Sequence, residues 1–193
     1  MIDDLKQILP IRERVRIDRP ERAAVLVPIV DDGGPTRLLL TRRTNDVATH
    51  QGQVAFPGGY GVPGEEDPLH TALREAEEEI GLSPSLVEIL GLLDDLPTLS
   101  DMVAVTPVVG LLSTLPPLAP QTGEVARIFT IPFADLMAPG RWVMKMEEHR
   151  GRLRRVFYFE HDGELLWGLS ARITLNLLGL TPGGPPIPLS RSG

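Results

Sequence analysis

The sequence predicts a single α/β domain in which helices pack on a β-sheet. Its 193 residues are close to the length of one average domain or slightly more. Apolar residues make up 42% and charged residues 23%, which is usual for a globular chain with a packed core. The chain contains both runs of β-branched apolar residues, typical of buried strands, and segments of helical periodicity.

The first part of the chain predicts one short helix and two strands that form a hairpin. Residues 3–9 have the pattern of an amphipathic helix, which Pro10 ends. The charged residues 12–19 follow, and we expect them to run over the surface as an approach to the domain. Residues 23–30 and residues 37–42 read as apolar strands, and the Asp and Gly residues between them favour a turn.

A longer helix is predicted over residues 68–80, after a loop that follows the short apolar segment 54–56. Asp67 is suited to cap its N-terminus, Pro68 to occupy its first position and Gly81 to end it. Apolar residues recur at helical spacing on one side of this segment and are expected to face the core. These residues are Leu69, Leu73, Ala76 and Ile80.

The second half of the chain predicts further strands and a closing helix. The strand candidates are residues 87–93, 103–111, 126–131, 141–146 and 156–160. The helix covers residues 170–178, and the segment after it, rich in Pro and Gly, is expected to be flexible. The predicted organisation is an N-terminal extension over residues 1–19, one domain over residues 20–180 and a tail over residues 181–193.

The longer helix carries three carboxylates on one face. At about 100° per residue, Glu75, Glu78 and Glu79 fall within an arc of roughly 100°, whereas Glu77 points elsewhere. Like charges at these spacings repel each other, and the C-terminal half of a helix adds a further penalty. A hard divalent cation such as Mg²⁺ would offset both, because it prefers oxygen ligands. The alternative is an ordinary solvated face, on which Arg74 is a surface partner of Glu78.

Three neighbouring elements resemble the signature box of the Nudix hydrolases. They are Phe56-Pro57-Gly58-Gly59, the loop Gly64-Glu65-Glu66 and the segment Arg74-Glu75-Ala76-Glu77-Glu78-Glu79-Ile80-Gly81-Leu82. The second half of the box fits at every fixed position, whereas the spacing of the first half puts its early glutamate at either Glu65 or Glu66. The resemblance implies a Nudix-type α/β/α sandwich with a mixed β-sheet. It also implies a hydrolase that cleaves a diphosphate with the help of bound Mg²⁺ or Mn²⁺.

The same resemblance implies roles for residues of the box. Glu75 and Glu79 look like the principal metal ligands, and Glu78 looks like a further ligand or the base that orients water. Arg74 looks like the residue that holds these carboxylates in position.

Outside the box, Glu124 resembles the acidic residue that other Nudix enzymes bring to the metal site. It is therefore the second candidate for the general base, and its alternative is a surface glutamate beside Arg127. Few other residues suit this chemistry, because the chain has no Cys and its four His lack the spacing of metal ligands.

A further motif resembles the extra signature of coenzyme A pyrophosphatases, a subgroup of the Nudix family. It joins a Leu-Leu-Thr-x-Arg strand, here residues 39–43, to a Gly-x-x-x-Phe-Pro-Gly-Gly element, here residues 52–59. Ala48 departs from this signature, which has a basic residue at that place. The similarity implies that coenzyme A is hydrolysed to 3′,5′-ADP and 4′-phosphopantetheine. The residues it implies in substrate binding are Arg42, Arg43, Phe56, Gly58 and Gly59.

Two other functions stay open at this stage. A Nudix enzyme that acts on ADP-ribose, NADH or another nucleoside diphosphate derivative would keep the same fold and metal chemistry. A non-catalytic Nudix-like binding module commonly lacks box carboxylates, all of which this chain retains. Four arginines around Gly151 are either a solvated hairpin tip or contacts for the 3′-phosphate of coenzyme A. They are Arg150, Arg152, Arg154 and Arg155.

Charge and hydropathy limit the partners and the location. A net charge of −7 argues against a nucleic-acid surface. The chain has no long apolar run suited to a membrane helix, and its acidic start does not resemble a signal peptide. We therefore expect a cytoplasmic protein with a small-molecule substrate and no membrane partner, and analogy with the family suggests a homodimer.

Overall fold

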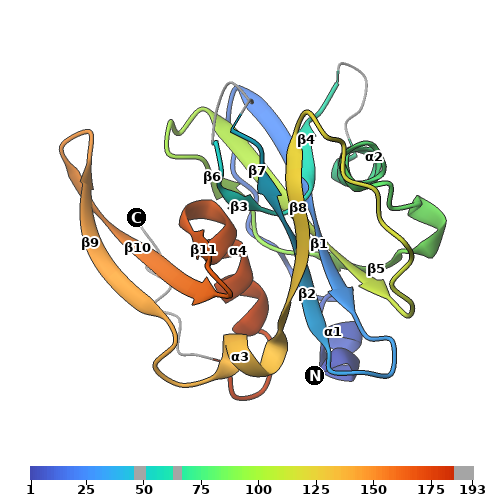
Figure 1. Cartoon of the computed structure of the whole chain (residues 1–193). Coiled ribbons are helices and arrows are strands. Elements are labelled where there is room, and N and C mark those ends of the chain that lie inside the picture. Colours follow the sequence, from blue (N-terminus) through green and yellow to red (C-terminus); the bar gives the residue numbers. More distant parts are fainter. Residues whose placement is uncertain (46–50, 63–66, 185–193) are drawn as a thin grey trace.

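The computed structural model describes residues 1–45, 51–62 and 67–184, in which helices separate groups of consecutive strands (Figure 1). The elements follow one another in this order: α1 (Ile2–Ile8), β1 (Glu21–Val30), β2 (Arg37–Arg43), β3 (Val54–Ala55), β4 (Gly58–Tyr60), α2 (Pro68–Ile80), η1 (Pro84–Leu86), β5 (Glu88–Leu92), β6 (Leu96–Pro97), β7 (Val103–Leu112), β8 (Val125–Pro132), α3 (Phe133–Met137), β9 (Val143–His149), β10 (Arg152–His161), β11 (Glu164–Trp167) and α4 (Gly168–Leu178).

Strand β1 lies at the centre of a mixed sheet that takes in eight of the described strands. On one side it runs parallel to β7, from Glu21 opposite Val103 to Val30 opposite Leu112. On its other side it pairs antiparallel with β4 near its start and with β2 at its end. Strand β2 also pairs with β3 and β8, and β7 also pairs with β5 and β6. The sheet is therefore mixed, as predicted.

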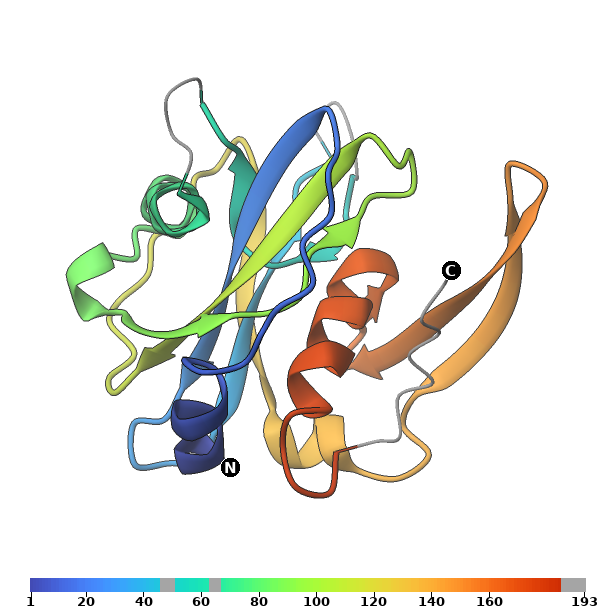
Figure 2. The same ribbon diagram turned by 180° about the vertical axis from the view of Figure 1, so that it is seen from behind.

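Helices cover both faces of this sheet, because the residues of β1 point alternately to its two sides. Leu26 belongs to a buried cluster on the α2 side, together with Ala76 and Ile80. Val27 belongs to a second cluster, in which residues of α1, α3 and α4 also lie. Figures 1 and 2 show α2 and α4 on opposite sides of the sheet. The predicted α/β/α sandwich is confirmed.

Helix α2 has the ends that its sequence predicts. The Asp67 side chain accepts a hydrogen bond from the backbone N–H of Leu69, and Pro68 occupies the first helical position. Gly81 ends the helix with a φ of 68°, a left-handed conformation that glycine adopts without strain. No helix in the described part of the chain is long and apolar enough to cross a membrane.

Strands β9, β10 and β11 form a second, antiparallel sheet, which we call the arm (Figure 1). The sequence predicts its two long strands as shorter segments, but in the structure they pair as far as His149 opposite Arg152. The turn between them contains Arg150 and Gly151, both with positive φ. At the base of the arm Phe159 is buried against the core, whereas Leu153 near the tip is exposed.

The N-terminal residues 1–19 are tied to the domain. Leu5 and Leu9 are buried in the cluster that α4 also joins. After them, the Arg12 guanidinium lies 2.7 Å from the Asp94 carboxylate. Arg14 pairs with Asp95, whose side chain is fully buried. The charged segment that is expected to run over the surface is thus held by carboxylates that lie about eighty residues later in the sequence.

Candidate active site

The three carboxylates on one face of α2 have different environments. Glu79 is buried, with 4% of its surface exposed, whereas the Glu78 side chain is 57% exposed. The Glu75 side chain is intermediate, at 18%. Glu77 is exposed. The carboxylate face therefore runs from the protein interior at Glu79 to solvent at Glu78.

Glu79 is the most perturbed carboxylate of the site. Burial raises its pKa from 4.5 to about 7, against the opposing effects of a hydrogen bond and a nearby cation. The hydrogen bond comes from the backbone N–H of Gly58, at 3.1 Å, and the cation is Arg43, whose Nη1 lies 3.5 Å from Glu79 Oε1. The negative charges of Glu75 and Glu124 also raise this pKa, so both lie close to Glu79.

Arg74 connects the other two carboxylates to the sheet. Its Nη1 lies 2.8 Å from Glu75 Oε1 and 3.3 Å from Glu78 Oε2. Its Nη2 donates to the carbonyl oxygen of Tyr60 at 3.2 Å. One guanidinium therefore fixes the positions of two carboxylates relative to β4, which is the arrangement expected of a residue that holds the site in shape.

Gly58 and Gly59 let β4 pass directly against α2. A Cβ at Gly59 would lie 2.5 Å from the carboxylate carbon of Glu75. A Cβ at Gly58 would lie 2.4 Å from the backbone oxygen of Ala24. Both distances are shorter than atoms tolerate, but the first obstacle is a side chain and the second is backbone. The two glycines are therefore required for different reasons.

We expect Gly59→Ala to lower kcat by about 10²-fold with little loss of stability, because the added methyl group displaces the Glu75 carboxylate by about an ångström. Gly58→Ala should instead destabilise the fold, since the backbone of β1 must move to make room. Thermal denaturation and steady-state kinetics of the two variants test this difference. A Gly59→Ala enzyme with unchanged kcat would show that the position of Glu75 does not matter.

Glu124 reaches the site from the segment that precedes β8. Its backbone oxygen accepts a hydrogen bond from the backbone N–H of Thr44, at 2.8 Å, just after β2. The backbone N–H of Gln121 donates to the backbone oxygen of Glu79 at 2.8 Å, at the end of α2. The segment 121–124 is thus anchored to both elements that flank the carboxylates. These backbone hydrogen bonds join distant parts of the chain, so the sequence carries no local signal of them.

Two residues predicted to bind substrate make their contacts elsewhere among the described residues. Arg42 faces Glu164 of β11 at 3.2 Å, and Arg127 of β8 shares this buried partner at 2.8 Å. Phe56 is 4% exposed and packs in the hydrophobic core, so its ring fills the interior. The early box glutamates, Glu65 and Glu66, lie outside the described residues.

The donors of the site suit a hard divalent cation. They are carboxylate oxygens, which Mg²⁺ and Mn²⁺ prefer. Among the described residues no three acidic or histidine side chains converge on one ion position. Mg²⁺ commonly takes only one or two protein carboxylates and completes its shell with water and phosphate oxygens. Glu75 and Glu79 fit that requirement, and the burial of Glu79 makes a positive partner favourable.

The raised pKa of Glu79 predicts how stability depends on pH without divalent cations. Between about 4.5 and 7 the folded state keeps a proton on Glu79 that the unfolded state releases, so stability falls as the pH rises through this window. The full penalty, present above pH 7, is on the order of 3 kcal/mol. In a chelator, the melting temperature of Glu79→Gln should exceed that of the wild type by several degrees at pH 8.

The same comparison at pH 4.5 is the control, because both proteins are then neutral at this position and the difference should nearly vanish. Added Mg²⁺ should raise the melting temperature of the wild type at pH 8 more than that of the variant. A difference between the two proteins that does not change with pH would contradict the raised pKa.

Comparison with known proteins identifies the family to which this site belongs. A family model described as the NUDIX domain matches residues 20–150, which is more than half of the chain. The chain belongs to the Nudix family. The matched range contains the carboxylates, Arg74, both glycines and Glu124. The predicted hydrolase class is thereby confirmed.

Curated relatives support the same assignment for this Nudix hydrolase. It is 41% identical over 156 residues to the uncharacterized Nudix hydrolase NudL of Photorhabdus laumondii, covering 81% of the chain and 82% of that protein. The protein of the same name from Pectobacterium atrosepticum is 40% identical over 157 residues, covering 81% of each.

Solved structures resemble this Nudix hydrolase in fold. A Caenorhabditis elegans Ap4A hydrolase in a binary complex matches with a TM-score of 0.50 and 21% identity, over 58% of this chain and 81% of that chain. A MutT/nudix family protein from Enterococcus faecalis matches with a TM-score of 0.51 and 16% identity, over 81% of this chain and 54% of that chain. At these identities the likeness concerns the fold alone.

Proposed function

We propose that this Nudix hydrolase cleaves the diphosphate of coenzyme A, with Mg²⁺ or Mn²⁺, into 3′,5′-ADP and 4′-phosphopantetheine. The observation that carries the proposal is that the strand resembling the coenzyme A pyrophosphatase signature ends at the carboxylates. Arg43, the last residue of that motif, lies 3.5 Å from Glu79. Gly58, in the second part of the motif, donates its backbone N–H to the same carboxylate.

The motif is also held together internally. The Thr41 hydroxyl donates to the backbone oxygen of Ala55 at 3.1 Å, which joins the two parts of the signature. The backbone N–H of Arg43 donates to the backbone oxygen of Gln53 at 3.0 Å. Strands β2 and β3 therefore support Arg43 from one side while α2 faces it from the other.

In this proposal, Glu75 and Glu79 hold the cation, and Glu78 is a further ligand or the base. When bound, the cation neutralises charge on the diphosphate and makes water a better nucleophile. Arg74 keeps Glu75 and Glu78 in place. Glu124 is the second candidate to take the proton of the attacking water, since it lies within electrostatic range of Glu79.

Arg43 is proposed to contact the diphosphate. Its Nε is buried and has no hydrogen-bond partner among the described residues. The Arg43 side chain as a whole is 24% exposed beside the carboxylates. Its guanidinium has other N–H donors besides the one facing Glu79, and we propose that these meet a phosphate oxygen.

The test is product identification after incubation with coenzyme A and Mg²⁺, followed by kcat/KM for coenzyme A, dephospho-coenzyme A, ADP-ribose and NADH. We expect 3′,5′-ADP and 4′-phosphopantetheine as products and the highest kcat/KM for coenzyme A. A preference for ADP-ribose or NADH would reject coenzyme A as the substrate and leave the metal site unaffected.

A further inference from the structure

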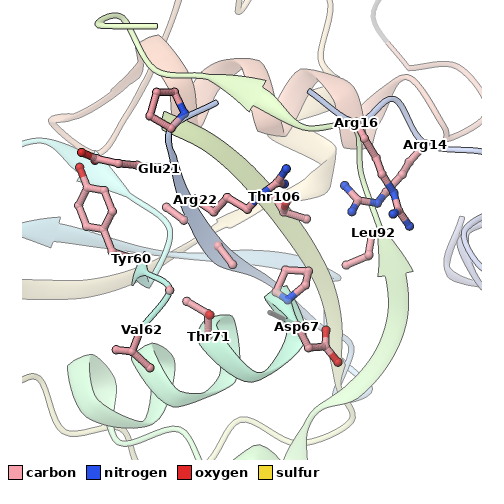
Figure 3. A pocket seen from close by; sticks show the side chains of 15 residues that line it. Arg14, Arg16, Glu21, Arg22, Tyr60, Val62, Asp67, Thr71, Leu92 and Thr106 are labelled. Atoms are coloured by element: carbon pink, nitrogen blue, oxygen red, sulfur yellow. The ribbon is translucent and has the colours of Figure 1, made fainter. Parts of the chain in front are cut away.

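A cavity of about 960 Å³ lies beside the N-terminal half of α2, on the face of β1 and β7 that α2 covers (Figure 3). We call it the arginine cavity, and define it by Arg16 and Arg22 at one end and by Tyr60, Val62 and Thr71 at the other. Its volume is in the range of cavities that bind small molecules. The box motif does not account for the residues of its charged end.

Among the described residues, the charged end of the arginine cavity is lined by more basic than acidic side chains. Figure 3 shows Arg14, Arg16 and Arg22 directed toward the same part of the cavity from two sides. Arg14 is neutralised by the buried Asp95. Arg16 has no hydrogen bond or ion pair within the described residues. Among the described residues, the ion-pair partner of Arg22 is the fully exposed Asp18 at 3.6 Å, a pair of little strength in water.

The two acidic residues that line the cavity in the described part of the chain, Glu21 and Asp67, do not cancel this charge. The Asp67 carboxylate is occupied by the N-terminus of α2, where it accepts the backbone N–H of Leu69 at 3.0 Å. The Glu21 side chain is directed away from the arginines in Figure 3. Two guanidinium groups without strong partners at one point of a cavity favour an anion with several oxygens, such as a phosphate monoester.

The other end of the arginine cavity is aromatic and aliphatic. Tyr60 is 58% exposed and Val62 is 50% exposed, so both keep free surface. A flat base gains most from such neighbours, because a ring face supports stacking and an aliphatic side chain excludes water. An arginine end and an aromatic end within one cavity match the two parts of a phosphorylated adenosine.

The arginine cavity adjoins the carboxylate face. Thr71 is one helical turn before Glu75, about 6 Å along the axis, and lies on the same side of α2. Tyr60 follows Gly59, which packs against the Glu75 carboxylate. The Arg74 guanidinium bridges these two elements through Glu75 and the Tyr60 carbonyl oxygen. A ligand that spans both places would therefore extend along a single helix.

We infer that the arginine cavity binds the phosphoadenosine end of the substrate, with Arg16 and Arg22 contacting a phosphate that is not cleaved and Tyr60 contacting the base. The identity of that substrate rests on the proposed function, whereas the preference for a phosphorylated adenosine rests on the cavity itself. The arginines at the tip of the arm are the competing location for the same phosphate.

The kinetic test compares coenzyme A with dephospho-coenzyme A, which lacks the 3′-phosphate. In the double variant Arg16→Met/Arg22→Met, kcat/KM for coenzyme A should fall by about tenfold or more, since hydrogen bonds to charged groups are strong. The value for dephospho-coenzyme A should change by less than about threefold. The matched control is Arg150→Met/Arg152→Met at the tip of the arm, which should leave both values near those of the wild type. The inference is overturned if the control variant shows a selective loss of kcat/KM for coenzyme A. It is also overturned if the cavity variant shows no such selective loss.

A binding test separates the inference from the proposed function. In a chelator, the wild type should bind 3′,5′-ADP about tenfold or more tightly than 5′-AMP, and the cavity variant should bind both alike. This preference requires no turnover, so it can hold even when coenzyme A proves not to be hydrolysed. If coenzyme A is hydrolysed but 3′,5′-ADP binds no more tightly than 5′-AMP, the proposed function stands and the role of the arginine cavity in phosphate binding is rejected. Tyr60→Ala should weaken the binding of both nucleotides, because both contain the adenine base.

Discussion

Replacing Glu79 by Gln is expected to lower kcat/KM with Mg²⁺ by about 10³-fold or more, because metal stabilisation of the transition state contributes several kcal/mol. Gln has nearly the same shape and can still accept the hydrogen bond from the backbone N–H of Gly58. The fold should therefore be kept, and the loss reports the missing charge. The measurement is kcat/KM at saturating Mg²⁺ for the wild type and the variant, with circular dichroism to confirm folding.

Glu77→Gln is the matched control for this result. Glu77 lies on the same helix within two residues of Glu79, but it is exposed, and the helical period places it off the carboxylate face. We expect its kcat/KM to stay within about twofold of the wild type, as is usual for a surface charge outside the site. Turnover that survives Glu79→Gln and still depends on Mg²⁺ would remove Glu79 from the metal site.

Asp95→Ala should lower the free energy of unfolding by about 3–5 kcal/mol, which corresponds to a melting temperature lower by roughly 10 °C. The Asp95 carboxylate is fully buried and accepts hydrogen bonds from the Thr106 hydroxyl at 2.7 Å and from the backbone N–H of Ile17 at 3.2 Å. It also pairs with Arg14, whose side chain is 13% exposed. Its removal leaves one buried cation and two buried donors without partners.

The control for this prediction is an exposed ion pair that also fixes the N-terminal segment. Lys6 and Glu88 lie 3.1 Å apart with side chains that are 41% and 52% exposed. Glu88→Gln should cost less than about 1 kcal/mol, because water screens such a pair. Chemical denaturation of both variants measures the two losses. Similar values for Asp95→Ala and Glu88→Gln would show that the buried carboxylate contributes no more than a surface one.

The sequence predicts α2 and the long strands well because their signals are local. The N-terminal cap, the first-position proline and the final glycine of α2 lie within the segment itself, and its apolar stripe repeats at helical spacing. Strands β4, β6 and β11 and helix α3 are not predicted. Each has five residues or fewer, which is too short for a pattern to repeat, and each is stabilised by its partners in the fold.

The candidate site is predicted in part for the same reason. The carboxylates share one helix, so their common face follows from geometry alone. The ion pair of Arg43 with Glu79 and the hydrogen bond from Gly58 depend on strands that approach the helix in space. The motif residue Phe56 is predicted to bind substrate, but the structure shows its ring packed in the core, a burial that the motif alone does not indicate. Spatial neighbours and burial are set by the fold, which local patterns do not encode.

The parallel pairing of β1 with β7 has a consequence for synthesis of the protein. Glu21 meets Val103 and Val30 meets Leu112, so the middle of the sheet joins residues about eighty positions apart. The ribosome must synthesise and release the chain beyond Leu112 before this pairing can form. Until then, the apolar strand segments of the first half of the chain stay exposed to solvent. Loop closure of that length slows folding and leaves a nascent chain open to aggregation. Chaperone contact during translation should therefore concentrate on the interval before β7 emerges.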